Sequence, residues 1–244
     1  MTPEELVATV CPLFASVGAA FYFDPATLAR GKEIGLDGFR FYFLGRGGVL
    51  GDVEAPVVQS AFGYFEPGLV AKIWDSARKI VPAREAARAY VEQSQRFGRD
   101  RFAGVEGLEP FCAAAEAVRD AAHPAGLALF AGLAAEPLAD DAPARAMQLV
   151  TVLREFRGSA HLLALVASGV SPMVAHYFRR PDDFTTFGYA EAEVPDLSAA
   201  DRSRIAAADA LTDTLVLPAF GVLDEAGRHA LTGGAQGMAE ALAS

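Results

Sequence analysis

Two residues in the stretch Arg154–Gly169, R-E-F-R-G-S-A-H-L-L-A-L-V-A-S-G, have side chains suited to chemistry. Arg157 and His161 are four residues apart, so on a helix they share a face. Together they could clamp a carboxylate or phosphate, and His161 could also transfer a proton as a general acid or base. The alternative is structural, with Arg157 paired to an acid such as Asp37 and His161 donating to a backbone carbonyl. The residues alone leave both interpretations open.

No other motif indicates a metal site, a cofactor or a nucleophile. The four histidines lack metal-ligand spacing, Cys11 and Cys112 form no C-x-x-C, and no serine stands in G-x-S-x-G. The loop G-R-G-G-V-L-G-D at 45–52 lacks the G-K-[ST] ending of a phosphate loop and predicts a turn that ends a helix. His176 and Tyr177 could reach a cleft, although a position at its rim is favoured. We therefore expect no metal and no cofactor.

The composition is that of a globular protein of a reducing compartment. The 244 residues are 52% hydrophobic and 21% charged, and no apolar run is long enough to span a bilayer. The N-terminal M-T-P-E-E-L lacks the basic region of a signal peptide, and the cysteines are lone, so we expect a cytoplasmic protein without a membrane partner. The net charge of −10 and the pI of about 4.9 disfavour binding to nucleic-acid phosphates.

Helical periodicity runs through almost the whole chain, whereas strand-like alternation is nearly absent. Thr2 can cap the first helix, and Asp24-Pro25 has the composition of a second helix start. The sequence therefore predicts an all-α protein. The expected helices are Pro3–Val17, Asp24–Lys32, Gly38–Leu44, Ala55–Phe65, Pro67–Ile80, Pro82–Phe102, Glu109–Ala122, Ala125–Leu133, Asp141–Gly169, Pro172–Phe178, Ser198–Leu223 and Glu225–Leu242.

An internal repeat indicates that these helices form two copies of one unit. The segment P-V-V-Q-S-A-F-G-Y at Pro56–Tyr64 recurs as P-D-D-F-T-T-F-G-Y at Pro181–Tyr189. The order of several flanking elements also agrees, which favours duplication over a chance match of aromatic-glycine words. We expect residues 1–120 and 121–244 to be two helical repeats of one compact bundle, related by a pseudo-two-fold axis with a cleft between them.

The repeat predicts where the Arg157–His161 pair lies. Aligning the two copies sets His161 opposite Phe41, so an aromatic wall would face a cationic and titratable one across the cleft. Clefts between halves are favoured ligand sites. Such a cleft would suit a small organic anion or aromatic molecule. Core packing is the favoured role of the two F-G-Y words, and the alternative is that Tyr64 and Tyr189 direct a hydroxyl into the cleft. The expected ligand-binding residues are Phe41, Tyr42, Tyr64, Arg157, His161 and Tyr189.

Three runs carry a resemblance to a known family. They are L-D-G-F-R-F-Y-F-L-G-R-G-G-V-L-G, S-A-F-G-Y-F-E-P-G-L-V and R-E-F-R-G-S-A-H-L-L-A-L-V-A-S-G, and R-G-x-x-H before a small, apolar helix is the most specific part. Over most of its length the chain resembles an actinobacterial family of helical proteins labelled helix-turn-helix or SalK-like. The resemblance implies a winged helix-turn-helix in the second half and a transcription regulator.

The sequence departs from a DNA reader where the resemblance would place one. After Ser171 it runs P-M-V-A-H-Y-F-R-R-P-D-D-F, which is aromatic and proline-broken, and Glu191–Pro195 is too short and acidic for a wing. The favoured hypothesis is a small-molecule-binding protein with its ligand in the cleft. The alternatives are an enzyme that uses His161 as general acid or base on a small organic substrate, and a regulator that reads DNA through Pro172–Tyr189. A homodimer is compatible with each.

Overall fold

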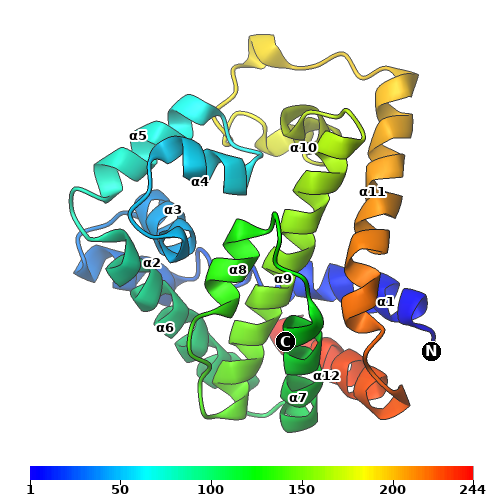
Figure 1. The fold of residues 1–244 in the computed structure, drawn as a ribbon. Coiled ribbons are helices and arrows are strands. Elements are labelled where there is room, and N and C mark those ends of the chain that lie inside the picture. The colour runs from blue at the N-terminus through cyan, green and yellow to red at the C-terminus, as the bar shows by residue number, and fades with distance from the viewer. Residues whose placement is uncertain (244) are drawn as a thin grey trace.

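The computed structural model describes residues 1–243, which form twelve α-helices and three short 3₁₀ helices without a strand among them (Figure 1). The predicted all-α fold is therefore confirmed. The α-helices are α1 (Pro3–Val17), α2 (Pro25–Glu33), α3 (Gly38–Gly47), α4 (Ala55–Phe62), α5 (Pro67–Ala77), α6 (Ala83–Phe102), α7 (Leu108–Ala121), α8 (Ala128–Ala134), α9 (Ala142–Ala167), α10 (Pro172–Arg179), α11 (Ala199–Phe220) and α12 (Glu225–Ala243). The 3₁₀ helices are η1 (Gly48–Leu50), η2 (Pro181–Asp183) and η3 (Glu191–Glu193).

Each predicted helix is present, and local signals explain where the helices begin and end. Thr2 forms a capping box at the start of α1, and Ser171 caps α10 ahead of a proline in the first turn. The helix predicted over Ala55–Phe65 ends earlier, at Phe62, because Gly63 follows it with a φ of +68°. Local chemistry therefore determines the helices, and packing determines how they meet.

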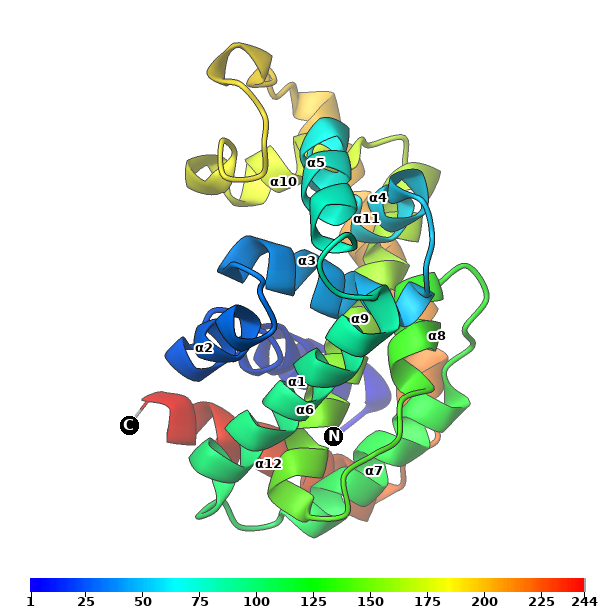
Figure 2. The ribbon, with the colours of Figure 1, turned by 90° about the vertical axis from the view of Figure 1, so that its left-hand side faces the viewer.

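The helix α9 is the central element and passes diagonally through the fold (Figure 1, Figure 2). It packs against α1, α6, α7, α8, α10 and α11. Because other helices cover it on nearly all sides, apolar residues occupy most of its circumference rather than one stripe. Glu155 lies in the middle of this apolar helix with only 2% of its side chain exposed. Such a carboxylate needs buried partners.

A sharp corner joins α9 to α10 at one end of the molecule. The chain turns there by 115°, and Gly169 provides the turn with a φ of +70°. The helix α10 and the connection that follows it lie beside α4 and α5 (Figure 1, Figure 2). Phe187 of that connection stacks on Phe65 with ring centroids 4.1 Å apart, and its carbonyl accepts a hydrogen bond from the Glu66 N–H at 2.8 Å. This contact brings the α4–α5 turn and the α10–α11 connection together.

Two kinds of element are absent from residues 1–243. They contain no strand and therefore no β-wing, and Glu191–Glu193, within the segment considered for a wing, forms a single 3₁₀ turn. The wing that the resemblance implied is not part of this segment. Among residues 1–243, no single helix is both long and apolar enough to cross a membrane. Two pairs of consecutive helices meet both conditions only when the two helices are counted together, and each pair is sharply bent.

The two words of the internal repeat have different secondary structure. Pro56–Tyr64 lies in α4 and the turn after it, whereas Pro181–Tyr189 lies in η2 and irregular turns. Both F-G-Y glycines nevertheless have a positive φ. The phenylalanines before them, Phe62 and Phe187, both contact the ring of Phe65. The duplication and its pseudo-two-fold axis remain a prediction.

Candidate functional site

A cavity of about 250 Å³ lies where α1, α3, α4, α9 and α10 meet, and it is the candidate site. Its wall is strongly cationic, because five arginines but a single carboxylate, that of Glu155, line it. Aromatic rings and His176 cover much of the rest. The arginines are Arg46, Arg154, Arg157, Arg179 and Arg180, and the aromatic residues are Tyr42, Phe62, Tyr64, Phe65 and Phe187.

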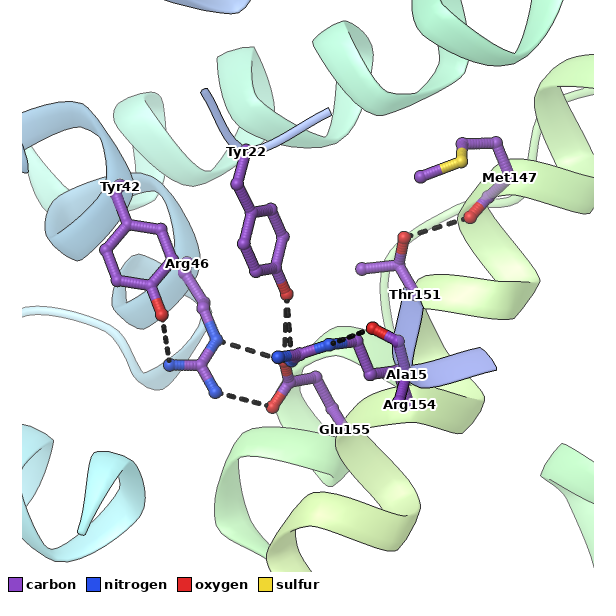
Figure 3. Close-up of polar contacts among 8 residues, drawn as sticks. All are labelled: Ala15, Tyr22, Tyr42, Arg46, Met147, Thr151, Arg154 and Glu155. Carbon is purple, nitrogen blue, oxygen red and sulfur yellow. Dashed lines mark hydrogen bonds and ion pairs between the residues drawn. The ribbon is translucent and has the colours of Figure 1, made fainter. Parts of the chain in front are cut away.

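Tyr42, Arg46, Arg154 and Glu155, which line one side of the cavity, belong to a network of charges and hydroxyls. Figure 3 shows the hydrogen bonds of this network. Arg46 on α3 holds Glu155 on α9 with two hydrogen bonds, from Nε at 3.0 Å and from Nη2 at 2.8 Å. Arg154 donates to the same carboxylate from Nη1 at 2.7 Å, and the Tyr22 hydroxyl donates to it at 3.1 Å. Arg46 also donates to the Tyr42 hydroxyl at 3.3 Å. One carboxylate therefore serves two arginines.

This network carries one more positive charge than negative. Burial alone would raise the pKa of Glu155, but the guanidiniums of Arg46 and Arg154 outweigh it and lower the pKa from 4.5 to about 2. Burial likewise opposes the charge of Arg46, yet Glu155 raises the pKa of Arg46 well above its ordinary value. Both arginines and the glutamate are therefore charged at neutral pH. A surplus positive charge in a buried place is unfavourable unless an anion offsets it.

The other three cavity arginines each pair with one acid. The pairs are Arg157 with Asp213 at 3.1 Å, Arg179 with Asp209, and Arg180 with Asp183 at 3.5 Å. The first two tie α9 and α10 to α11. Because these charges balance one to one, the surplus resides in the Glu155 network.

Two buried nitrogens of the cavity wall, Arg157 Nε and His176 Nε2, have no hydrogen-bond partner within residues 1–243. His176 is 5% exposed and lies against Phe187 with ring centroids 3.8 Å apart. Burial lowers the pKa of His176, so its imidazole is neutral at neutral pH. A buried polar group without a partner costs about 1–3 kcal/mol. Both nitrogens would therefore gain from a bound group.

Outside this cavity, residues 1–243 offer little chemistry. A second hollow of about 270 Å³ beside α9 and α11 is lined by apolar side chains apart from His123. These residues include no group of three or more His, Cys, Asp or Glu side chains placed to hold a metal ion. Cys11 and Cys112 are free and buried, and burial raises the pKa of Cys11, at the wall of the first cavity, to about 12. Its thiol is therefore protonated at neutral pH.

Comparison with known proteins identifies the family. A model of a helix-turn-helix family matches residues 8–232, which is most of the chain. The chain belongs to this helix-turn-helix family. No curated protein and no solved structure matches it. Two corners have the angle and the short, glycine-containing turn of a helix-turn-helix, the α9–α10 corner at 115° and the α11–α12 corner at 120°. The actinobacterial, SalK-like assignment remains a prediction.

Three of the six residues predicted to bind a ligand line the cavity of this helix-turn-helix family member, namely Tyr42, Tyr64 and Arg157. Burial raises the pKa of Tyr64 to about 12, so its hydroxyl remains protonated and can donate. Arg157 pairs with Asp213 rather than with the expected Asp37, whose carboxylate caps α3 instead. The role of these three residues in binding remains a prediction.

Phe41 and Tyr189, also expected in the ligand site, do not line the cavity. Phe41 is 1% exposed and packs edge-on against Tyr90 at 5.0 Å. Successive residues of a helix point about 100° apart, so the turn of α3 that directs Tyr42 to the cavity directs Phe41 into the core. Tyr189 stacks on Phe184 with ring centroids 4.9 Å apart. The predicted aromatic wall therefore has other members.

His161, which was predicted to face Phe41 across one cleft, does not line this cavity either. The Thr212 hydroxyl donates to the Ala208 carbonyl at 2.7 Å, so it accepts from His161 Nδ1 at 2.8 Å. Burial, with Arg179 nearby, lowers the pKa of His161 to about 4. His161 is thus a neutral hydrogen-bond donor that connects α9 to α11. The structural alternative expected a backbone carbonyl as its acceptor, whereas the acceptor is the Thr212 hydroxyl.

Sequence reasoning missed the buried network and the histidine of the wall. The glycine-rich stretch 45–52 does end a helix, as expected, but α3 ends at Gly47 instead of Leu44, so its last turn places Arg46 at the cavity. His176 lies inside the wall rather than at a rim. A usable signal was Glu155, because a carboxylate in the middle of a helix that is apolar on most sides requires cationic partners.

Proposed function

We propose that this helix-turn-helix family member binds a small organic anion in the arginine-lined cavity. The observation that carries the proposal is the charge of the wall, with five arginines against a single carboxylate on a chain whose net charge is −10. A bound anion would offset the surplus charge of the Glu155 network. The aromatic rings favour a ligand with a flat, apolar part, and a volume of about 250 Å³ suits a small molecule.

DNA binding is the competing function, because it is compatible with membership of a helix-turn-helix family. A recognition helix reads base edges with residues of its first turns. In α10 these residues are the apolar Pro172, Met173 and Val174, and Arg179 at its other end is paired with Asp209. We therefore rank ligand binding first. Retardation of DNA fragments in a gel shift at low salt would favour the regulator instead.

An enzyme built on the same cavity is the second alternative. Its predicted general acid or base, His161, contacts Thr212 away from the cavity and has its pKa lowered to about 4 by burial. We therefore propose binding and assign no reaction to the cavity. The free, buried Cys11 and Cys112 suit a reducing compartment, and the proposal extends to a cytoplasmic location.

Gly158 allows the proposal to be tested without disturbing the charged network. It lines the cavity on α9, and a Cβ built on it would meet no heavy atom within 4 Å beyond its own helix backbone. Gly158→Leu should fill part of the cavity without strain, and removing a helical glycine should keep or raise stability. Gly233 is the matched control, because it is an exposed glycine on α12 that also has no neighbour within 4 Å and does not line the cavity.

Native mass spectrometry would detect a co-purified compound, and thermal shift assays with aromatic carboxylates, sulfonates and phosphates would detect added anions. We expect the wild-type protein and Gly233→Leu to bind. Gly158→Leu should bind at least about tenfold more weakly, with no fall in its melting temperature in buffer. Equal binding by Gly158→Leu would overturn the proposal. So would the combination of no co-purified compound and no stabilising anion for the wild-type protein.

A further inference from the structure

Two neighbouring arginines of α9 present free donors in the cavity wall. Arg154 and Arg157 are three residues apart, so they share a face of the helix, and both line the cavity. The hydrogen bonds of Arg154 start at Nε and Nη1, and that of Arg157 starts at Nη2. Arg154 Nη2 has no acceptor among residues 1–243, and neither has the buried Nε of Arg157. The only further contact of the Arg157 guanidinium in these residues is with the Cys11 thiol, which is a weak acceptor.

Building on the proposed function, we infer that the ligand is a small aromatic monocarboxylate whose carboxylate lies between Arg154 and Arg157. The free donors belong to two planar guanidiniums, and such groups bind the two oxygens of a carboxylate through paired hydrogen bonds. The rings of Phe62 and Tyr64 stand in the same wall and provide an apolar surface for the aromatic body. The carboxylate of the ligand would contact the arginines of the wall, and its flat aromatic ring would contact the aromatic side chains.

The balance of charges limits the ligand to one negative charge. Arg157 is offset by Asp213, whereas Arg46 and Arg154 share the single charge of Glu155. One further negative charge, on the ligand, would balance the positive charges of these three arginines. A second one would have no arginine left to offset it and would be repelled by the buried carboxylate of Glu155. At an effective dielectric constant of about 20, like charges roughly 6 Å apart repel enough to weaken binding about a hundredfold.

Three probes with the same phenyl ring separate the possible charges. Phenylacetate carries one negative charge, phenyl phosphate carries two at slightly alkaline pH, and phenylacetamide carries none. Isothermal titration calorimetry on the full chain should show phenylacetate binding at least about tenfold more tightly than either of the others.

Arg157→Gln tests the position of the carboxylate, and Arg145→Gln is its matched control. Both arginines are on α9, they have 33% and 22% of their side chains exposed, and each pairs with an acid of another helix. Only Arg157 lines the cavity. We expect Arg157→Gln to bind phenylacetate at least about tenfold more weakly, and Arg145→Gln to bind it as the wild type does. If circular dichroism shows Arg157→Gln to be unfolded, Arg157→Lys keeps the charge without the planar fork and should weaken binding about tenfold.

The outcomes distinguish this inference from the proposed function. Tighter binding of phenyl phosphate or phenylacetamide than of phenylacetate would overturn the monocarboxylate and leave anion or ligand binding in place. Unchanged phenylacetate binding by Arg157→Gln would overturn the position between the two arginines. Failure of every anion in the wider panel to bind, with no co-purified compound, would overturn the proposed function itself.

Discussion

Replacing Glu155 by glutamine should destabilise the protein by about 3 kcal/mol. The pKa of this carboxylate is about 2 instead of 4.5, because Arg46 and Arg154 together outweigh the effect of burial. At roughly 1.4 kcal/mol per pKa unit, the shift corresponds to about 3 kcal/mol of folding free energy. Removal of one partner from a buried ion pair costs about 3–5 kcal/mol in other proteins, which agrees. The variant would keep two partly buried guanidiniums without a counter-charge.

The same network predicts how this loss depends on pH. The pKa of Glu155 is lower in the folded protein than the ordinary value of 4.5, so its stabilisation is fully present above pH 4.5 and is lost as the pH falls toward 2. The gap in unfolding free energy between the wild type and Glu155→Gln should therefore be largest near neutral pH. This difference between the two proteins should narrow as the pH falls from 4.5 toward 2.

Urea denaturation followed by circular dichroism measures both effects, and Glu136→Gln is the matched control. Glu136 is also buried, with 5% of its side chain exposed, but it pairs with Arg84, which is 47% exposed and can turn to solvent. Its loss should therefore cost about 1 kcal/mol or less. A loss below about 1 kcal/mol for Glu155→Gln, or equal losses in the two variants, would refute the reasoning. A gap that persists unchanged at acid pH would refute it as well.

Three other positions give predictions that are checked by similar measurements. The pKa of His161 falls from 6.5 to about 4 on folding, so its contribution to folding stability is present above pH 6.5 and is lost as the pH falls toward 4. In urea titrations between these pH values, His161→Asn should therefore lose less unfolding free energy than the wild type. Equal losses would contradict this. Gly188→Ala should cost about 1–3 kcal/mol in urea and speed proteolysis within residues 180–198, because Gly188 has a φ of +96° and the new Cβ would lie 2.9 Å from Leu69 Cβ. Gly158→Ala should raise the unfolding free energy by about 0.5–1 kcal/mol, since the methyl group enters open space on a helix; a lower value would contradict this.

The helices could be predicted from the sequence because their signals are local. Thr2 and the periodicity after it locate α1 from Pro3 to Val17, as the structure has it. The helix expected over Ala55–Phe65 was too long, because α4 ends at Phe62 and Gly63 adopts a positive φ. Glycine permits this φ, but the turn that packs Phe65 into the core requires it. Helix ends that depend on tertiary packing are not encoded in the neighbouring residues alone.

The cavity was only partly predictable because its wall depends on which helix faces meet. Tyr42 and Phe41 are adjacent in the chain, and a rotation of about 100° decides that the first lines the cavity and the second enters the core. The partner of Arg157 is Asp213, 56 residues away, and no local pattern distinguishes it from Asp37. The buried Glu155 did require cationic partners, but the sequence did not say which arginines would reach it.

The contacts that enclose the cavity connect distant parts of the chain, and this determines when the site exists. Arg46 and Glu155 are 109 residues apart in the sequence. Phe65, which precedes α9 in the chain, stacks on Phe187, which follows it. Loops of that length close only when the tertiary structure forms, so a partly folded chain with intact helices has no site. The proposed ligand would therefore stabilise only the completely folded chain. A protein with the proposed ligand bound would resist proteolysis longer than the free protein, because proteases cleave the opened chain.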